Sequence, residues 1–301
     1  MKSNSELISK PAIQFLLIFC LVATIAVLLS FIGVTIGILI FKFNPHVIEN
    51  PFIASPQDVE GLKFVQLITA VGAFIIAPIV YMIITSKSRL ADLKLKRVNK
   101  PINYLIILIL MIISSPILSL IIEVNAQVGL SEFMMEEQAK QDYITKLLLT
   151  FSGWGSLLYI LLIIAVVPAI GEELLFRGVV QKIFTKWTNN YHVGIWITAI
   201  LFSFFHMQFH GFVPRMLLGA FLGYALVWSG SLWVPMLGHF FNNGSVVVLS
   251  YFYPEMMENP DMSIFGEIGK NPIVIITSLI LTIVGIMIFR KVNLPIQQDI
   301  E

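Results

Sequence analysis

The chain has 301 residues, of which 57% are hydrophobic and 12% are charged, and its formal net charge is +1. This composition is too apolar for an ordinary soluble domain of this length. No basic patch stands clear of the flanks of the apolar runs, which argues against nucleic-acid binding. The single cysteine, Cys20, excludes an intrachain disulfide framework.

The apolar runs predict an all-α polytopic membrane protein with about eight transmembrane helices. Several runs reach the roughly 20 residues that cross a bilayer. The first is too long for the apolar region of a signal peptide, so we expect a retained transmembrane helix. The predicted spans are residues 12–41, 64–85, 102–122, 150–187, 193–208, 213–228, 232–251 and 272–289.

The lysine and arginine positions predict that both termini are cytoplasmic. With that orientation, the inside segments hold 13 Lys and Arg against 6 acidic residues, whereas the outside segments hold 5 against 12. The asymmetry agrees with the positive-inside rule. The strongest predicted cytoplasmic anchor consists of Lys87, Arg89, Lys94, Lys96, Arg97 and Lys100.

Two segments leave alternatives open. Residues 131–146 could form an amphipathic helix on the outer interface or a solvated loop. The fourth span could end at Ile170, which leaves the following carboxylates at the inner surface, or run to about Trp187, which buries them. Antiparallel helices joined near Asn189 would place Glu172 and His206 at the same depth, so we favour the longer helix.

Five ionisable side chains and one amide lie in these apolar surroundings, where such groups are usually functional. Glu173 and Arg177 are four residues apart and predict a buried salt bridge that supports the helix. Glu172 has no cation on its own helix, and a carboxylate in an apolar pocket suits a general base. The alternative is that both acids only pair with Arg177 or fill a polar hole.

His206, His239 and Asn243 complete the candidate site. We expect His206 to assist Glu172 in activating water. His239 and Asn243 share one helix face and could stabilise an oxyanion, or they could only link helices by hydrogen bonds. Arg215 is expected at the membrane interface, where its side chain can snorkel.

The motifs Glu172-Glu173-xxx-Arg177, Phe202-xxx-His206 and His239-xxx-Asn243, with the preceding Gly230-Ser231-Leu232-Trp233-x-Pro235, resemble the CPBP family. This family contains the type II CAAX prenyl endopeptidases and the bacterial Abi proteins. The resemblance covers residues 165–250. It implies one integral membrane unit, with N-terminal helices in residues 1–145 and a catalytic helical core in residues 146–301.

The resemblance implies an intramembrane endopeptidase that cuts a membrane-associated or lipidated peptide or protein. Glu172 and His206 would activate water, His239 and Asn243 would form the oxyanion hole, and Glu173 and Arg177 would support the site. It also implies a bacterial cytoplasmic membrane location and a site open toward the cytoplasm. The oligomeric state and the pathway, whether bacteriocin immunity, peptide-signal processing or sensor regulation, are left open.

Metal use has two interpretations. We favour a glutamate mechanism that requires no cofactor, because the HExxH motif is absent. Glu172, His206 and His239 could still form a three-ligand zinc site. Two other functions compete with the peptidase: a non-catalytic membrane scaffold or immunity protein that keeps the polar core for packing, and a proton-coupled transporter.

Overall fold

The structure is a computed structural model that describes residues 10–85, 93–96, 98–255 and 271–294. In these residues it is helical and contains no strand, so the all-α prediction is confirmed. Part of the predicted cytoplasmic anchor, namely Lys87, Arg89 and Arg97, lies outside the described residues.

Six helices of the described chain are long and apolar enough to cross a membrane, which supports an integral membrane protein. They are α2 (Pro11–Phe41), α3 (Pro56–Ala70) with its continuation through η3 (Val71–Ile76) and α4 (Ala77–Thr85), α5 (Ile102–Ala126), Trp154–Thr188, Phe209–Ser229 and α15 (Pro272–Asn293).

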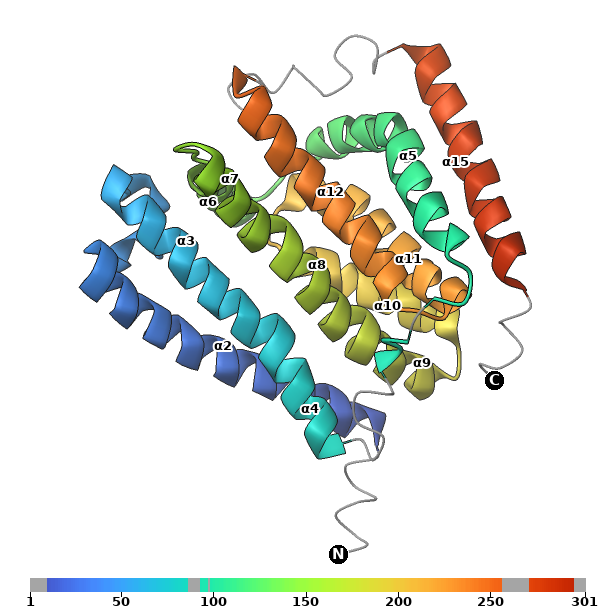
Figure 1. Cartoon of the computed structure of the whole chain (residues 1–301), viewed down its shortest axis with the longest axis horizontal. Helices are drawn as coiled ribbons and strands as arrows, with labels where there is room; N and C mark the ends of the chain where they lie inside the picture. Colours follow the sequence, from blue (N-terminus) through green and yellow to red (C-terminus); the bar gives the residue numbers. More distant parts are fainter. Residues whose placement is uncertain (1–9, 86–92, 97, 256–270, 295–301) are drawn as a thin grey trace, which may run out of the picture.

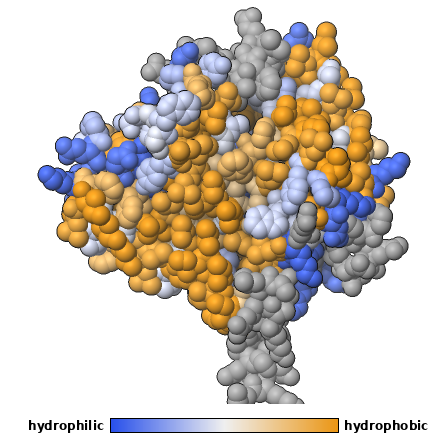
Figure 2. Space-filling model, viewed as in Figure 1, coloured by the Kyte–Doolittle hydropathy of each residue, from blue (hydrophilic) through white to orange (hydrophobic). Residues whose placement is uncertain are grey.

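The remaining two predicted spans correspond to α10 (Tyr191–Phe204) and α12 (Trp233–Phe252). The first is a shorter apolar helix, and neither belongs to the six. The count of eight spans and the orientation of the termini therefore stay predictions. The broad apolar surface seen in Figure 2, with hydrophilic residues toward its margins, agrees with a lipid-facing exterior.

The fourth long helix is the centre of the fold (Figure 1). It consists of α7 (Trp154–Leu161), the π-helix η5 (Leu162–Val166), α8 (Val167–Glu172), the π-helix η6 (Glu173–Val180) and α9 (Gln181–Thr188). The α3–α4 helix packs on one side of it and α12 on the other. This confirms the longer placement of the fourth span.

The hairpin that follows fixes the depth of the next helix. Asn189 ends α9 in the left-handed conformation, with φ of 51°, and its backbone N–H donates to the Thr185 carbonyl. The side chain of Asn190 accepts from the backbone N–H groups of His192 and Val193 and so caps α10. Two residues therefore reverse the chain and place α10 beside α9.

The segment between the third and fourth spans is a helix rather than a loop. It forms α6 (Glu132–Leu148), and the side chain of Ser131 caps it by accepting from the N–H of Met134. Its position on an outer membrane interface stays a prediction.

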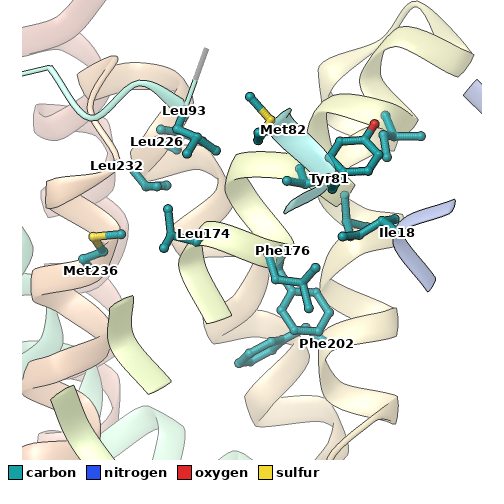
Figure 3. Packing of buried hydrophobic residues seen from close by; sticks show 14 residues of the cluster. Ile18, Tyr81, Met82, Leu93, Leu174, Phe176, Phe202, Leu226, Leu232 and Met236 are labelled. Atoms are coloured by element: carbon teal, nitrogen blue, oxygen red, sulfur yellow. The ribbon is translucent and has the colours of Figure 1, made fainter. Parts of the chain in front are cut away.

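Apolar side chains from several helices pack around the first half of η6 (Figure 3). Leu174 and Phe176 of η6 are buried there, together with Phe202 of α10 and Met236 of α12. In η6, Glu173 directly precedes Leu174 and Arg177 directly follows Phe176. The packed apolar side chains therefore hold both polar groups in place.

Gly171 allows a close approach between the central helix and η3. A Cβ atom at this position would lie 2.7 Å from Cβ of Phe74 and 3.2 Å from the Phe74 carbonyl carbon. Backbone cannot move aside as a flexible side chain can, so only glycine fits here. The residue directly before Glu172 thereby fixes how closely η3 packs against the site.

We predict that Gly171→Ala lowers the free energy of unfolding by about 1–3 kcal/mol, because the added methyl group overpacks this contact. Gly155→Ala is the matched control, since a Cβ at Gly155 meets nothing within 4 Å. Thermal unfolding of both variants in one detergent would measure the difference. Equal melting temperatures would contradict the packing argument.

Candidate active site

The two adjacent carboxylates lie where α8 passes into the π-helix η6. Glu172 is the last residue of α8 and is 8% exposed, whereas Glu173 begins η6 and is 0% exposed. Single π-helical turns inside α-helices occur often at functional sites. The prediction that both carboxylates are buried is confirmed.

Glu173 and Arg177 form the predicted salt bridge. Nη1 of Arg177 donates to Oε1 of Glu173 over 2.7 Å, and Nη2 donates to the Gly219 carbonyl oxygen of α11 (Phe212–Ser229) over 3.0 Å. The guanidinium carbon also lies 4.7 Å from the centre of the Phe202 ring. Arg177 therefore joins the central helix to α10 and α11.

Glu173 has a second partner that the sequence did not reveal. Nδ1 of His239 lies 2.8 Å from Oε1 of Glu173. Because a carboxylate oxygen only accepts, Nδ1 carries the hydrogen of the neutral ring. Glu173 thus fixes both the orientation and the tautomer of His239, in addition to pairing with Arg177.

His206 does not lie on a helix, contrary to the predicted span 193–208. The helix α10 ends at Phe204, and His206 lies in the turn that follows, where Met207 has a φ of 53°. Nδ1 of His206 donates to the Phe202 carbonyl oxygen over 2.7 Å. The backbone of the motif Phe202-xxx-His206 therefore positions the imidazole, a role that the sequence did not assign to Phe202.

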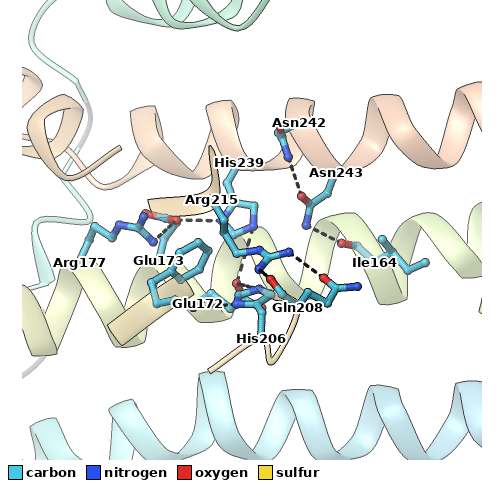
Figure 4. A network of polar contacts seen from close by, with 11 residues as sticks. Ile164, Glu172, Glu173, Arg177, His206, Gln208, Arg215, His239, Asn242 and Asn243 are labelled. Carbon is cyan, nitrogen blue, oxygen red and sulfur yellow. Dashed lines mark hydrogen bonds and ion pairs between the residues drawn. The ribbon is translucent and has the colours of Figure 1, made fainter. Parts of the chain in front are cut away.

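Three acceptor atoms converge at the centre of this network (Figure 4). Oε2 of Glu172 lies 3.8 Å from Nε2 of His239 and 4.0 Å from Nε2 of His206. Since both Nδ1 atoms donate elsewhere, each neutral ring presents a lone pair at Nε2. Oε2 of Glu172 is buried and accepts no hydrogen bond from the described residues. The arrangement requires a hydrogen donor between the three atoms.

No group of three or more His, Cys, Asp or Glu side chains in the described part of the chain has an arrangement suited to a metal ion. The three-ligand zinc site of Glu172, His206 and His239 stays an alternative prediction beside the metal-free one. His210 contributes backbone groups rather than its ring to the hydrogen bonds of this region.

Asn243 has a hydrogen bond of its own on the same helix face as His239. Its Nδ2 donates to the Ile164 carbonyl oxygen over 2.9 Å. Pro168, four residues after Ile164, has no N–H group, so this carbonyl lacks its usual helical donor. Asn243 thus satisfies a backbone oxygen that the proline leaves free, and its other N–H stays a candidate oxyanion donor.

Arg215 was expected at the interface but lies beside the site (Figure 4). Its Nη2 donates to Oε1 of Gln208 over 2.7 Å, and Gln208 in turn donates to Asp142 of α6 over 3.3 Å. Electrostatic coupling links Arg215 to Glu172. A single arginine in an otherwise apolar span was the available signal for these contacts, and its position at a membrane interface stays a prediction.

The turn that carries His206 is anchored from two further helices. Nδ2 of Asn125 at the end of α5 donates to the carbonyl oxygens of Phe209 and His210. Oε1 of Gln138 on α6 accepts from the backbone N–H of His210 over 3.1 Å. These contacts satisfy backbone groups of a turn that has no helical partners for them.

Residues 154–245 match the family model described as type II CAAX prenyl endopeptidase Rce1-like. This segment is similar to the Rce1-like family. It contains Glu172, Glu173, Arg177, His206, His239 and Asn243, so the resemblance drawn from the motifs is confirmed. The Rce1-like family is a protease family, which supports a peptidase at that level.

One curated protein, the uncharacterized protein YpbD of Bacillus subtilis (strain 168), is 33% identical over 76 residues. The match covers 24% of this chain and 35% of YpbD, so the chain matches only about a third of that relative's length. No solved structure matches the chain significantly.

We predict that Arg177→Ala lowers the free energy of unfolding by about 3–5 kcal/mol, because it leaves Glu173 buried without its cation. Lys140→Ala is the control, since Lys140 pairs with Glu136, which is 66% exposed, and ion pairs between exposed groups contribute little to stability. Chemical unfolding in detergent would compare the two. An Arg177→Ala protein as stable as Lys140→Ala would refute the buried pair.

Proposed function

We propose that the protein is an intramembrane endopeptidase that hydrolyses a peptide bond of a membrane-associated or lipidated peptide or protein. The observation that carries the proposal is that Nε2 of His206 and Nε2 of His239 both lie within 4.0 Å of Oε2 of Glu172. The match to the Rce1-like family supports the same class of reaction.

A water molecule is the donor that suits this centre. The gaps of 3.8 and 4.0 Å are too long for direct hydrogen bonds but suit a bridging water. Such a water donates to Glu172 and to one histidine and keeps a lone pair for attack. His206 is partly open, with 31% of its side chain exposed, so the site is not sealed from substrate.

Glu172 then acts as the general base. It takes one proton from water while the oxygen forms a bond to the carbonyl carbon of the substrate. The proton is passed to the amide nitrogen as the carbon–nitrogen bond breaks. His206 accepts from the attacking water and keeps it on the side of Glu172.

The developing oxyanion requires hydrogen donors. We assign one donor to His239, whose Nε2 faces Oε2 of Glu172 over 3.8 Å and donates when that atom carries a hydrogen. Asn243 supplies its second N–H, since the first is held by Ile164. The sequence assigned these two roles, and they stay part of the proposal.

The substrate is proposed to reach the site from the bilayer, with the opening toward the cytoplasm. A lipidated or membrane-bound peptide fits because the surrounding helices are apolar and long enough to span the membrane. The family that residues 154–245 match is described as type II CAAX prenyl endopeptidases. Whether this chain requires a prenyl group is a separate question of specificity.

The same polar core would also suit a non-catalytic scaffold, because Glu173, Arg177 and Gly219 link two helices whatever the chemistry. The match of residues 154–245 to the Rce1-like family favours the peptidase over the scaffold.

We predict that Glu172→Gln keeps the fold and lowers cleavage at least about 100-fold, because an amide cannot accept a proton from water at neutral pH. The measurement compares C-termini and small peptides in membranes of cells that express wild type or variant at equal levels. Mass spectrometry identifies the products, and these name the substrate.

Glu136→Gln is the control, since Glu136 is an exposed carboxylate on α6. Products that persist in Glu172→Gln would contradict the assignment of the base. Identical product profiles in wild type, both variants and a deletion strain, together with an altered phenotype in the deletion strain alone, would favour the scaffold.

We also predict that a strong chelator changes the cleavage rate less than about twofold, because the proposed mechanism uses Glu172 as the base without a metal. The assay uses the purified full chain and a substrate identified as above. Loss of activity that zinc restores would overturn the metal-free mechanism while leaving the peptidase assignment intact.

A further inference from the structure

A cavity lies outside the candidate active site, between α5, α10, α11 and α15. Its volume is about 530 Å³, within the ~300–1,000 Å³ of pockets that hold small molecules. Leu110 and Leu118 of α5 form one wall, Leu218 and Phe221 of α11 a second, and Ile283 of α15 a third.

The helix α11 separates this cavity from the active site. Leu218 and Phe221 of α11 line the cavity. On the side of the active site, the Gly219 carbonyl oxygen accepts a hydrogen bond from Arg177, and Arg215 donates one to Gln208. A ligand in the cavity would therefore share a helix with the site without touching Glu172.

A kink in α5 shapes the cavity. Pro116 interrupts this helix, and α5 changes direction in its second half (Figure 1). Ser278 of α15 repairs the break, because its hydroxyl donates to the Ile113 carbonyl oxygen over 2.6 Å and accepts from the Ile117 N–H over 3.2 Å. The two helices are thus held together beside the cavity.

Most groups that line this cavity are apolar, with the hydroxyl groups of Ser114 and Thr282 among them, and three further polar side chains lie at one end. At that end lie Arg290 in the last turn of α15, His192 at the start of α10 and Tyr224 near the end of α11. Nδ1 of His192 and the hydroxyl of Tyr224 share a hydrogen bond of 2.8 Å. The lining therefore matches an amphiphile with one polar end.

Arg290 lacks an anionic partner. No hydrogen bond or ion pair joins it to another residue within the described ranges 10–85, 93–96, 98–255 and 271–294. The guanidinium group is suited to phosphate, which it binds through two parallel hydrogen bonds. Basic pockets between transmembrane helices on the cytoplasmic side bind anionic lipid head groups, and the end of α15 is the side predicted to be cytoplasmic.

The length of the cavity matches one leaflet. From Leu279 to Arg290, the wall formed by α15 is about 17 Å long at ~1.5 Å per residue, which is roughly half of the ~30 Å hydrocarbon core. An acyl chain whose phosphate meets Arg290 would therefore end near the bilayer centre.

We propose that this cavity is a binding site for one anionic phospholipid, with an acyl chain between α5, α11 and α15 and the phosphate at Arg290. The Arg290 guanidinium and the polar pair His192–Tyr224 hold the head group. The proposal does not depend on peptidase activity.

The test measures lipid binding to the purified full chain in a mild detergent by native mass spectrometry. Dioleoyl phosphatidylglycerol is the anionic probe, and dioleoyl phosphatidylcholine is the neutral probe with the same chains. Wild type is expected to retain one phosphatidylglycerol at least about fivefold more tightly than phosphatidylcholine. Arg290→Gln should remove this preference, whereas the matched control Lys291→Gln should keep it.

A second variant tests the position of the acyl chain. Leu218→Trp fills the cavity and should lower the binding of both lipids, and a photoreactive acyl chain should label α11 or α15. The proposal is overturned if wild type shows no head-group preference, if Arg290→Gln and Lys291→Gln lower it equally, or if the label lies on α2 or α3. Should Arg290→Gln fail to fold, the proposal is tested by the head-group preference of wild type and by which helices the photoreactive chain labels.

Discussion

The buried carboxylate of Glu173 is the interaction on which the candidate site depends. One of its oxygens accepts from both Arg177 and His239, and Arg177 also donates to the backbone of α11. An ionised carboxylate with no exposed surface is stable only with such partners. The same atom therefore balances a cation and orients a histidine, and through Arg177 it connects three helices.

The sequence alone predicted the parts of the fold that follow from the length of apolar runs, the rise of an α-helix and the spacing of residues on one helix. Long apolar runs located the six long helices, and helix geometry placed Glu172 level with His206 across the Asn189 turn. The spacing of Glu173 and Arg177 predicted their salt bridge. Each inference used a constant rise or a fixed spacing, so it needed no knowledge of neighbouring helices.

Contacts between distant segments could not be obtained in this way. The pairing of Glu173 with His239 joins residues 66 positions apart, and the bond from Asn243 to Ile164 depends on a carbonyl that Pro168 leaves free. The early end of α10 arises because Asn125 and Gln138 provide partners for the turn after it. These partners come from α5 and α6, which the local sequence around His206 does not specify.

The short hairpin between α9 and α10 has a consequence for how such a site can vary. An insertion of one residue between Asn190 and Phe202 would rotate everything that follows by about 100° and lift it by about 1.5 Å. The Phe202 carbonyl and the His206 ring would then turn away from Glu172 together. The number of residues in this segment is consequently as strict a requirement as the identity of the histidine, and related chains should differ in length elsewhere.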